Sequence, residues 1–127
     1  ARKTLRIDGD LQLEDGIRLI KTPGHTLGSQ SVVVDTEVGR VVFVGDLCLF
    51  DFMMFPGSPE ILDMEGNPHP IPKAPPAFGP ALPHAMVYDY YAYYDSVQKV
   101  KAAAEKDAPG YLVCGHEPSL LVRGIGG

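Results

Sequence analysis

Two valine-rich runs, separated by only four residues, place the tightest constraint on how this chain can fold. They span residues 31–35 and 40–44, and residues 36–39 between them are typical of a β-hairpin turn. Both runs contain consecutive valines, so each strand would be apolar on both of its faces. A strand of this kind needs helices or a second sheet over both faces. The pattern therefore predicts a sheet inside a layered α/β domain.

Residues 50–84 differ from the rest of the chain because they hold nine of the twelve prolines. Proline fixes φ and has no backbone N–H, so the composition predicts a long loop without a helix or a central strand. We expect this loop to be inserted within a single domain that spans residues 1–127. An apolar cluster at its start favours a loop packed on the protein over a solvated tether. The cluster consists of Phe50, Phe52, Met53, Met54 and Phe55.

A helical period follows the loop, over residues 86–106. Apolar side chains recur there at steps of three and four, polar residues occupy the other side, and a Pro-Gly pair ends the segment. One helix with several short strands predicts an α/β fold in which a helix packs on a mainly antiparallel sheet. The remaining strands are expected at residues 4–7, 11–13, 17–21 and 111–114.

Charge and composition exclude several classes of partner. The net charge is −5 without a cluster of Lys or Arg, so neither nucleic acid nor an anionic membrane surface is expected as a partner. No apolar stretch is long enough to span a membrane, and no segment resembles a signal peptide. Two cysteines, Cys48 and Cys114, do not make a disulfide framework, so we expect buried thiols in a cytoplasmic protein. The sequence leaves open whether these thiols approach the functional site and whether the protein forms a homodimer.

Three turns beside predicted strands each carry a side chain that can bind a metal ion: His25, Asp46 and His116. In each turn a glycine lets the backbone bend sharply, and the next residue projects from the edge of the sheet. Imidazole nitrogens and carboxylate oxygens suit zinc and similar divalent ions. Each residue taken alone is more often an ordinary turn residue. Together they predict a metal site at one edge of the sheet.

These turns resemble the last three metal-binding motifs of the metallo-β-lactamase superfamily, in the family's order. The resemblance extends from about Leu5 to Leu121, and the tyrosine-rich helix before the last motif is similar to the N-acyl homoserine lactonase branch, a group associated with quorum quenching. It implies that the chain is the C-terminal half of the superfamily's αβ/βα sandwich. The matching motifs are Thr22-Pro23-Gly24-His25-Thr26, Phe43-Val44-Gly45-Asp46 and Gly115-His116.

The resemblance implies a metal-dependent hydrolase that uses a metal-bridging hydroxide to open a lactone or cleave a related ester. It assigns His25 to one ion, His116 to the other, and Asp46 as the bridging ligand and the catalytic residue that passes a proton to the leaving oxygen. The implied cofactors are two divalent ions, zinc foremost. The family's first motif, His-x-His-x-Asp-His, is absent, since the other histidines are His69 and His84. The N-terminal half of the same protein is thus an expected partner, and the chain alone is expected to be inactive.

The sequence assigns no substrate-binding residue. Leu49 occupies the position where many lactonases of this branch carry a tyrosine that hydrogen-bonds the substrate carbonyl. His84, Tyr88 or Tyr90 could replace that tyrosine, although helix tyrosines are more often core aromatics. Two alternatives remain. One is the same fold and metals acting on a thioester, phosphoester or amide, and the other is a binding or regulatory half without catalysis.

Overall fold

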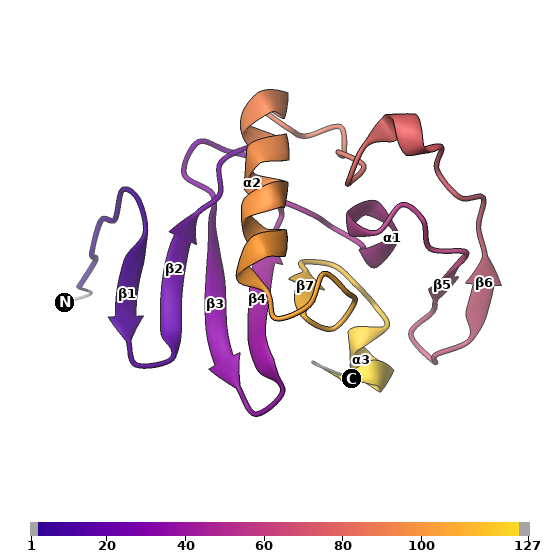
Figure 1. Cartoon of the computed structure of the whole chain (residues 1–127), viewed down its shortest axis with the longest axis horizontal. Coiled ribbons are helices and arrows are strands. Elements are labelled where there is room, and N and C mark those ends of the chain that lie inside the picture. The colour runs from indigo at the N-terminus through magenta and orange to yellow at the C-terminus, as the bar shows by residue number, and fades with distance from the viewer. Residues whose placement is uncertain (1–2, 125–127) are drawn as a thin grey trace.

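A five-stranded mixed sheet carries one long helix in the computed structural model, which describes residues 3–124 (Figure 1). The strand order is β1-β2-β3-β4-β7. The first four strands are antiparallel to their neighbours, and β7 joins β4 in parallel. The strands are β1 (Leu11–Glu14), β2 (Ile17–Lys21), β3 (Gln30–Thr36), β4 (Gly39–Gly45) and β7 (Leu112–Cys114).

The valine-rich hairpin lies within this sheet, which confirms the strand assignments for residues 31–35 and 40–44. Val33 pairs with Val42 on one face, and Val34 pairs with Val41 on the other. Gly39 closes the hairpin with a φ of 111°, a left-handed conformation that favours glycine. The last strand is one residue shorter than predicted, since β7 begins at Leu112 rather than at residue 111. The strand predicted at residues 4–7 was wrong, because the first strand of the sheet is β1 and residues 4–7 pair with no other strand.

Helix α2 (Tyr90–Ala103) confirms the predicted helix but is shorter than residues 86–106. It begins at Tyr90 rather than at residue 86, because the backbone N–H groups of Tyr88 and Asp89 donate to the carbonyl of Gly24. The Asp89 side chain accepts a hydrogen bond from Ala92 N at 3.0 Å and so caps the first turn. In the described residues 3–124 no helix has the length and apolar character needed to cross a bilayer.

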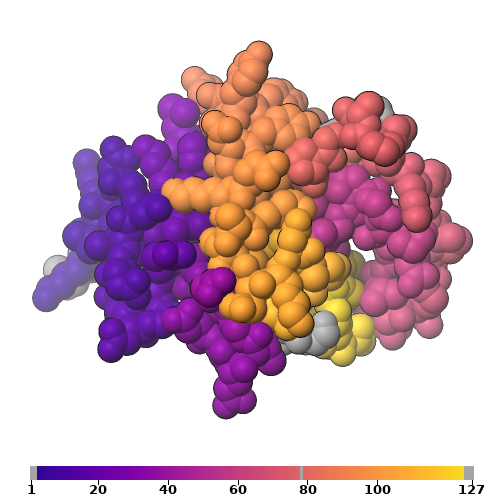
Figure 2. Space-filling view, viewed as in Figure 1, coloured from indigo at the N-terminus to yellow at the C-terminus, as the bar shows by residue number. Residues whose placement is uncertain are grey.

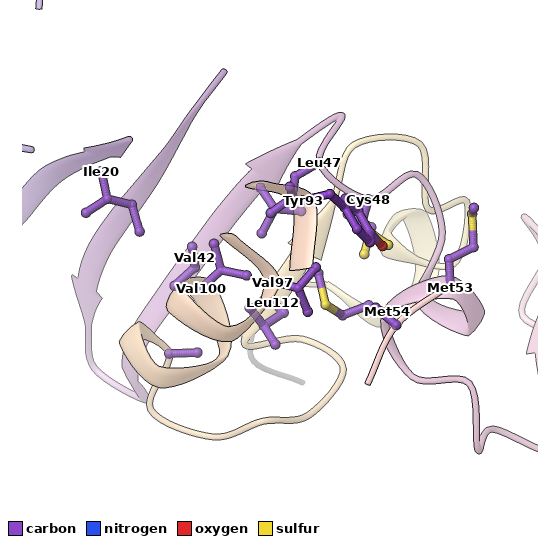
Figure 3. Close-up of a cluster of buried hydrophobic side chains, with 14 of the residues drawn as sticks. Ile20, Val42, Leu47, Cys48, Met53, Met54, Tyr93, Val97, Val100 and Leu112 are labelled. Carbon is purple, nitrogen blue, oxygen red and sulfur yellow. The ribbon is translucent and has the colours of Figure 1, made fainter. Parts of the chain in front are cut away.

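The core lies between α2 and one face of the sheet. Val97 and Val100 of the helix are fully buried and gather near Val42 and Leu112 (Figure 3). Complete burial of one such side chain stabilises the fold by roughly 1.5–3 kcal/mol relative to an exposed position. The helix therefore anchors the centre of the sheet by apolar packing.

The two faces of the sheet are covered unequally. On the face beneath α2, Val33 is 3% exposed and Val42 is completely buried. On the opposite face Val41 is completely buried and Val113 is 7% exposed, but the strand register groups with them five apolar side chains that are only partly buried. They are Ile17, Leu19, Val32, Val34 and Phe43. Valine-rich strands with two apolar faces, of which one is incompletely covered, are what the sequence pattern led us to expect.

The Pro-rich segment, residues 50–84, is more structured than the sequence predicted. It contains helix α1 (Asp51–Met54), a separate two-stranded sheet of β5 (Glu60–Leu62) and β6 (Pro68–Pro70), and the 3-10 turn η1 (Pro76–Phe78). The prediction of a loop without a helix was wrong for α1, a short helix that lies before the first proline of the segment, whereas neither β5 nor β6 is a central strand of the main sheet. Backbone hydrogen bonds from Asp63 N to Asn67 O and from Ile71 N to Pro59 O flank the pair, so both strand prolines occupy positions whose missing N–H the pair does not use.

The start of the Pro-rich segment packs against the core, as its apolar cluster predicted. Met54 is completely buried and Met53 is 9% exposed, while Phe50, Phe52 and Phe55 are partly buried against the same core. The rest of the segment is mostly exposed and forms a wide loop at one side of the molecule. Figure 2 shows an opening within this loop. Helix α3 (Leu120–Arg123) ends the described chain.

Candidate functional site

Three turns meet at one end of the sheet and carry the predicted ligands. Strands β2, β4 and β7 end at this edge, and the antiparallel β3 begins there. His25 Nε2 lies 3.8 Å from Asp46 Oδ2, and His116 Nε2 lies 3.2 Å from Asp46 Oδ1. The structure thus brings together residues that are up to 91 positions apart in the chain, with each imidazole facing a different oxygen of one carboxylate.

Glycines allow the Asp46 and His116 turns to touch. Gly45 bends the chain after β4 with a φ of 59°. A Cβ on Gly115 would lie 2.6 Å from the carbonyl oxygen of Gly45 and 2.9 Å from Asp46 Oδ1, which no real side chain tolerates. Backbone hydrogen bonds from His116 N to Leu49 O and from Gly115 N to Cys48 O hold the two turns together.

The His25 turn is held by the N-terminal part of α2. The hydroxyl of Ser96 donates to Pro23 O at 2.6 Å, and Gly24 O accepts from two backbone N–H groups just before the helix. A Cβ on Gly24 would lie 2.8 Å from Tyr93 Cα, so the loop and the helix are in direct backbone contact. The position of His25 therefore depends on a helix that begins 65 residues later.

A backbone carbonyl fixes the tautomer of His25. Its Nδ1 lies 2.6 Å from Met86 O, and a carbonyl oxygen can only accept, so Nδ1 carries the proton. The lone pair then sits on Nε2, the nitrogen that faces Asp46. This is the form in which an imidazole binds a metal, with its second nitrogen donating to a carbonyl. His116 differs, because its Nε2 faces a carboxylate oxygen and donates to it.

The donor set fits part of a metal centre. Two imidazole nitrogens and two carboxylate oxygens are ligands that zinc accepts, and the site is open, since the side chains of Asp46 and His116 are 46% and 59% exposed. Within residues 3–124, however, no group of three or more His, Cys, Asp or Glu side chains is arranged to hold a metal ion. Three residues also cannot complete two sites that each need about four ligands.

Neither cysteine is suited to be a metal ligand at this edge. Cys48 and Cys114 are free thiols with 0% and 1% exposure. A hydrogen bond with Cys48 raises the pKa of the Cys114 thiol, and burial raises it further, so the thiol stays protonated. A protonated buried thiol is a small apolar side chain rather than a metal ligand. The two thiols do approach each other, and they do so beneath the turns.

The residues considered as substitutes for the lactonase tyrosine are placed differently. Leu49 packs against the core, whereas Tyr88 and Tyr90 are 74% and 48% exposed. His84 reaches the site, but both of its ring nitrogens are engaged by backbone groups. His69 lies elsewhere, 2.9 Å from Asp63 within the Pro-rich segment.

Sequence reasoning missed two partners of the site: the carbonyl of Met86 and the backbone role of His84. A backbone carbonyl leaves no mark in the sequence, because every residue has one. His84 was visible as a histidine at the end of the Pro-rich segment. The sequence did not show which groups His84 contacts, because these contacts depend on the path by which the Pro-rich segment returns to the edge of the sheet.

Comparisons with known proteins agree with the fold. The chain is similar to the structure of an N-acyl homoserine lactone hydrolase with the product N-hexanoyl-L-homoserine bound at its catalytic metal centre (TM-score 0.54, 24% identity, 87% of this chain and 34% of that chain). It is also similar to a quorum-quenching N-acyl homoserine lactone lactonase (TM-score 0.56, 23% identity, 90% of this chain and 37% of that one). A probable metal-dependent hydrolase from Staphylococcus aureus matches at 10% identity (TM-score 0.52, 87% of this chain and 31% of that one).

The likeness covers most of this chain but only part of each neighbour. The chain spans about a third of the length of the solved structures it matches. No protein-family model matches it, and no curated protein matches its sequence. The fold is therefore confirmed as a partial metallo-β-lactamase fold, with a mainly antiparallel sheet and a packed helix.

Proposed function

We propose that this chain is the C-terminal portion of a metal-dependent hydrolase that opens a lactone or cleaves a related ester. One observation carries the proposal: two imidazoles from separate turns face the two oxygens of the Asp46 carboxylate at an open edge of the sheet. His25 would serve one divalent ion, His116 a second, and Asp46 both. Zinc is the first candidate for these ions, given the nitrogen and oxygen donors.

The remaining ligands would come from an N-terminal portion that is not in this chain. Two features support such a partner. The ligand set is incomplete, and one apolar face of the sheet is only partly buried. A second layer of the sandwich over that face would remove Val32, Val34 and Phe43 from water, which is worth roughly 25 cal/mol per Å² of apolar surface.

The residues of this chain would have distinct roles in hydrolysis. Two divalent ions, when bound, lower the pKa of a shared water and polarise the substrate carbonyl. His25 presents a bare Nε2 because Met86 O holds the proton on Nδ1. Asp46 would help to hold both ions, and its carboxylate could accept the proton that the attacking water gives up and pass it to the leaving oxygen as the ester bond breaks.

An apolar pocket whose lining includes the two residues after His116 supports an acyl substrate. A pocket of about 200 Å³ begins at Glu117 and Pro118, directly after His116, and is walled by Phe50, Phe52 and Ile61. The structural neighbours include N-acyl homoserine lactone hydrolases, whose substrates join an acyl chain to a lactone. We therefore propose an N-acyl lactone as the first substrate to test.

A second candidate function keeps the fold and the metals but hydrolyses another type of bond. Leu49 offers no proton donor where lactonases of this kind carry a tyrosine, and His84 has no free nitrogen. A substrate whose carbonyl or phosphoryl oxygen needs no such donor would suit this edge, so thioesters, phosphoesters and amides are the alternatives. A binding or regulatory half without catalysis is the third possibility.

The first experiment is to read the gene sequence upstream of the codon for Ala1. A His-x-His-x-Asp-His motif within about one domain length is expected for the enzyme, and its absence would favour the binding half. The protein that carries both portions is then titrated with Zn²⁺ and supplied with N-acyl lactones, aryl esters, thioesters and phosphotriesters. We expect about two zinc ions per protein and turnover of the lactones.

Single variants of the ligands test the assignment. His25→Ala, Asp46→Asn and His116→Ala should each weaken zinc binding and reduce turnover by at least about a hundredfold. His69→Ala is the matched control, because His69 lies in the Pro-rich segment against Asp63. Equal zinc binding by the three ligand variants and the control would overturn the proposal.

A further inference from the structure

We propose that His84 is a positioning residue that holds the Asp46 turn and, through Met86, keeps His25 in its metal-binding tautomer. This inference rests on the proposed function for its catalytic meaning, although the contacts themselves do not. His84 is 9% exposed and comes from the end of the Pro-rich segment, 38 residues after Asp46. It links a segment that is otherwise mostly outside the site to two of the three candidate ligands.

Both ring nitrogens of His84 have fixed roles. The backbone N–H of Met86 donates to His84 Nδ1 at 3.1 Å, so Nδ1 must carry a lone pair. His84 Nε2 lies 2.8 Å from the carbonyl oxygen of Asp46, which can only accept, so Nε2 must carry the proton. One neutral tautomer satisfies both contacts at once. The ring therefore acts as a rigid connector between the backbones of Asp46 and Met86.

Met86 passes this constraint on to His25. The N–H of Met86 is held by His84, and its carbonyl accepts the Nδ1–H of His25 at 2.6 Å. The His25 and His84 rings lie beside each other, with centroids 5.2 Å apart. If Met86 moved away, His25 would lose the acceptor that keeps the proton off Nε2. Partners of this kind are worth roughly 10-fold to 100-fold in metal affinity.

The Asp46 contact acts on the bridging carboxylate. Asp46 follows Gly45, whose φ of 59° turns the chain sharply, and the carbonyl of Asp46 points to His84. His84 supplies a buried hydrogen bond at that point, and the carboxylate projects from the same residue. Loss of this partner would leave the carbonyl of Asp46 without its hydrogen bond, and we expect the turn that carries the carboxylate to become less well fixed.

Three substitutions separate the two contacts. His84→Ala removes both. In His84→Asn, the side-chain oxygen replaces Nδ1 and can still accept from Met86 N. In His84→Gln, the side-chain nitrogen replaces Nε2 and can still donate to Asp46 O. His69→Ala, a histidine of the same segment whose contact is with Asp63, is the control.

The first measurement needs no metal and no activity. Nitrogen-15 spectra of the metal-free full-length protein, at a pH where imidazoles are neutral, report which ring nitrogen of His25 is protonated. We expect Nδ1–H in the wild type, His69→Ala and His84→Asn, and a mixture of tautomers in His84→Ala and His84→Gln. If His25 showed only the Nδ1–H signal in folded His84→Gln or His84→Ala, the proposed effect of His84 on the His25 tautomer through Met86 would be overturned.

The second measurement is zinc affinity, by competition with a chelator. We expect a loss of about 10-fold to 100-fold for His84→Ala and a smaller loss for each of the two amide variants. Affinities of all three within twofold of the wild type would overturn the positioning role. A wild-type protein that binds no zinc would instead contradict the proposed function, while the His25 spectra would still decide the tautomer. If His84→Ala does not fold, the two amide variants decide both questions.

Discussion

The ligand edge and the Pro-rich segment are neighbours that obtain their order in different ways. At the edge, the turns that carry His25, Asp46 and His116 follow strands whose last or second-to-last residue is buried, and the backbones of the Asp46 and His116 turns touch. In the Pro-rich segment most residues are exposed, and β5 pairs only with β6. Buried residues near the strand ends thus place both imidazoles within 3.8 Å of the Asp46 carboxylate, whereas the Pro-rich segment is tied to the protein mainly near its two ends.

The largest contrast should come from removing one apolar side chain in each region. Leu112→Ala, at a completely buried position of β7, should lower the free energy of unfolding by about 2–5 kcal/mol. Ile61→Ala, at a position that is 36% exposed in β5, should lower it by at most about 1 kcal/mol. Urea denaturation measures both, and equal losses would show that the two regions form one cooperative core.

A glycine in each region gives the next contrast. Gly115→Ala would force a Cβ against the carbonyl of Gly45 and should destabilise the fold by about 1–3 kcal/mol. Gly57→Ala has open space around its Cβ and an ordinary φ, so it should be neutral or stabilise by up to about 1 kcal/mol. Thermal unfolding of both variants tests this, and a tolerated Gly115→Ala would mean that the two turns can separate.

The start of α2 joins the two regions, and its cap should have a smaller effect. Asp89→Ala removes the acceptor for Ala92 N and should cost about 1 kcal/mol. Asp95→Ala, at an exposed position inside the same helix, is the control. Hydrogen exchange should show faster opening of the first turn of α2 and of the Gly24 contacts in Asp89→Ala alone. Unchanged hydrogen exchange in Asp89→Ala would mean that the Asp89 cap does not hold the start of α2 against the Gly24 turn.

The smallest expected effect is a pH dependence within the Pro-rich segment. Burial raises the pKa of Asp51, although Arg123 Nη1 lies 2.7 Å from its carboxylate. The folded chain therefore binds this proton more tightly than the unfolded chain. The resulting stabilisation is complete below the ordinary carboxyl pKa of about 3.9 and is lost as the pH rises through the raised value.

Asp51→Asn removes this titration and so isolates it. The free energy of unfolding of the wild type minus that of Asp51→Asn should decrease as the pH rises from below about 3.9 through the raised pKa of Asp51. Denaturation series at several pH values provide the measurement. A difference that grows with pH would mean that Arg123 outweighs burial and lowers the pKa of Asp51.

The sequence predicted the parts of the molecule that depend on periodic apolar burial. The strand runs around Val33 and Val42 and the helical period through Val97 were readable because each repeats every two or every three to four residues. The convergence of the ligand turns followed from strand ends sharing one edge. Those assignments concern where the backbone goes, and the roles of the three ligands in metal binding stay a prediction.

The remainder depended on backbone contacts between distant segments. Residues 86–89 looked helical, but their N–H groups are used by Gly24 and His84 instead. The β6 strand was missed because the effect of proline depends on which N–H groups the pair uses, and register is not visible in composition. Leu49 could be read from the sequence as a missing donor, whereas the engagement of both His84 nitrogens could not.

Parallel pairing of β7 with β4 sets the order in which the chain can be assembled. Until β7 emerges from the ribosome, β4 is a valine-rich strand with an unpaired edge. Such an edge can pair with a strand of another chain. The interval lasts through synthesis of the whole Pro-rich segment and α2, and contacts across so long a loop form slowly. The nascent protein should therefore be most prone to aggregate late in translation, and co-translational chaperones should matter most in that window.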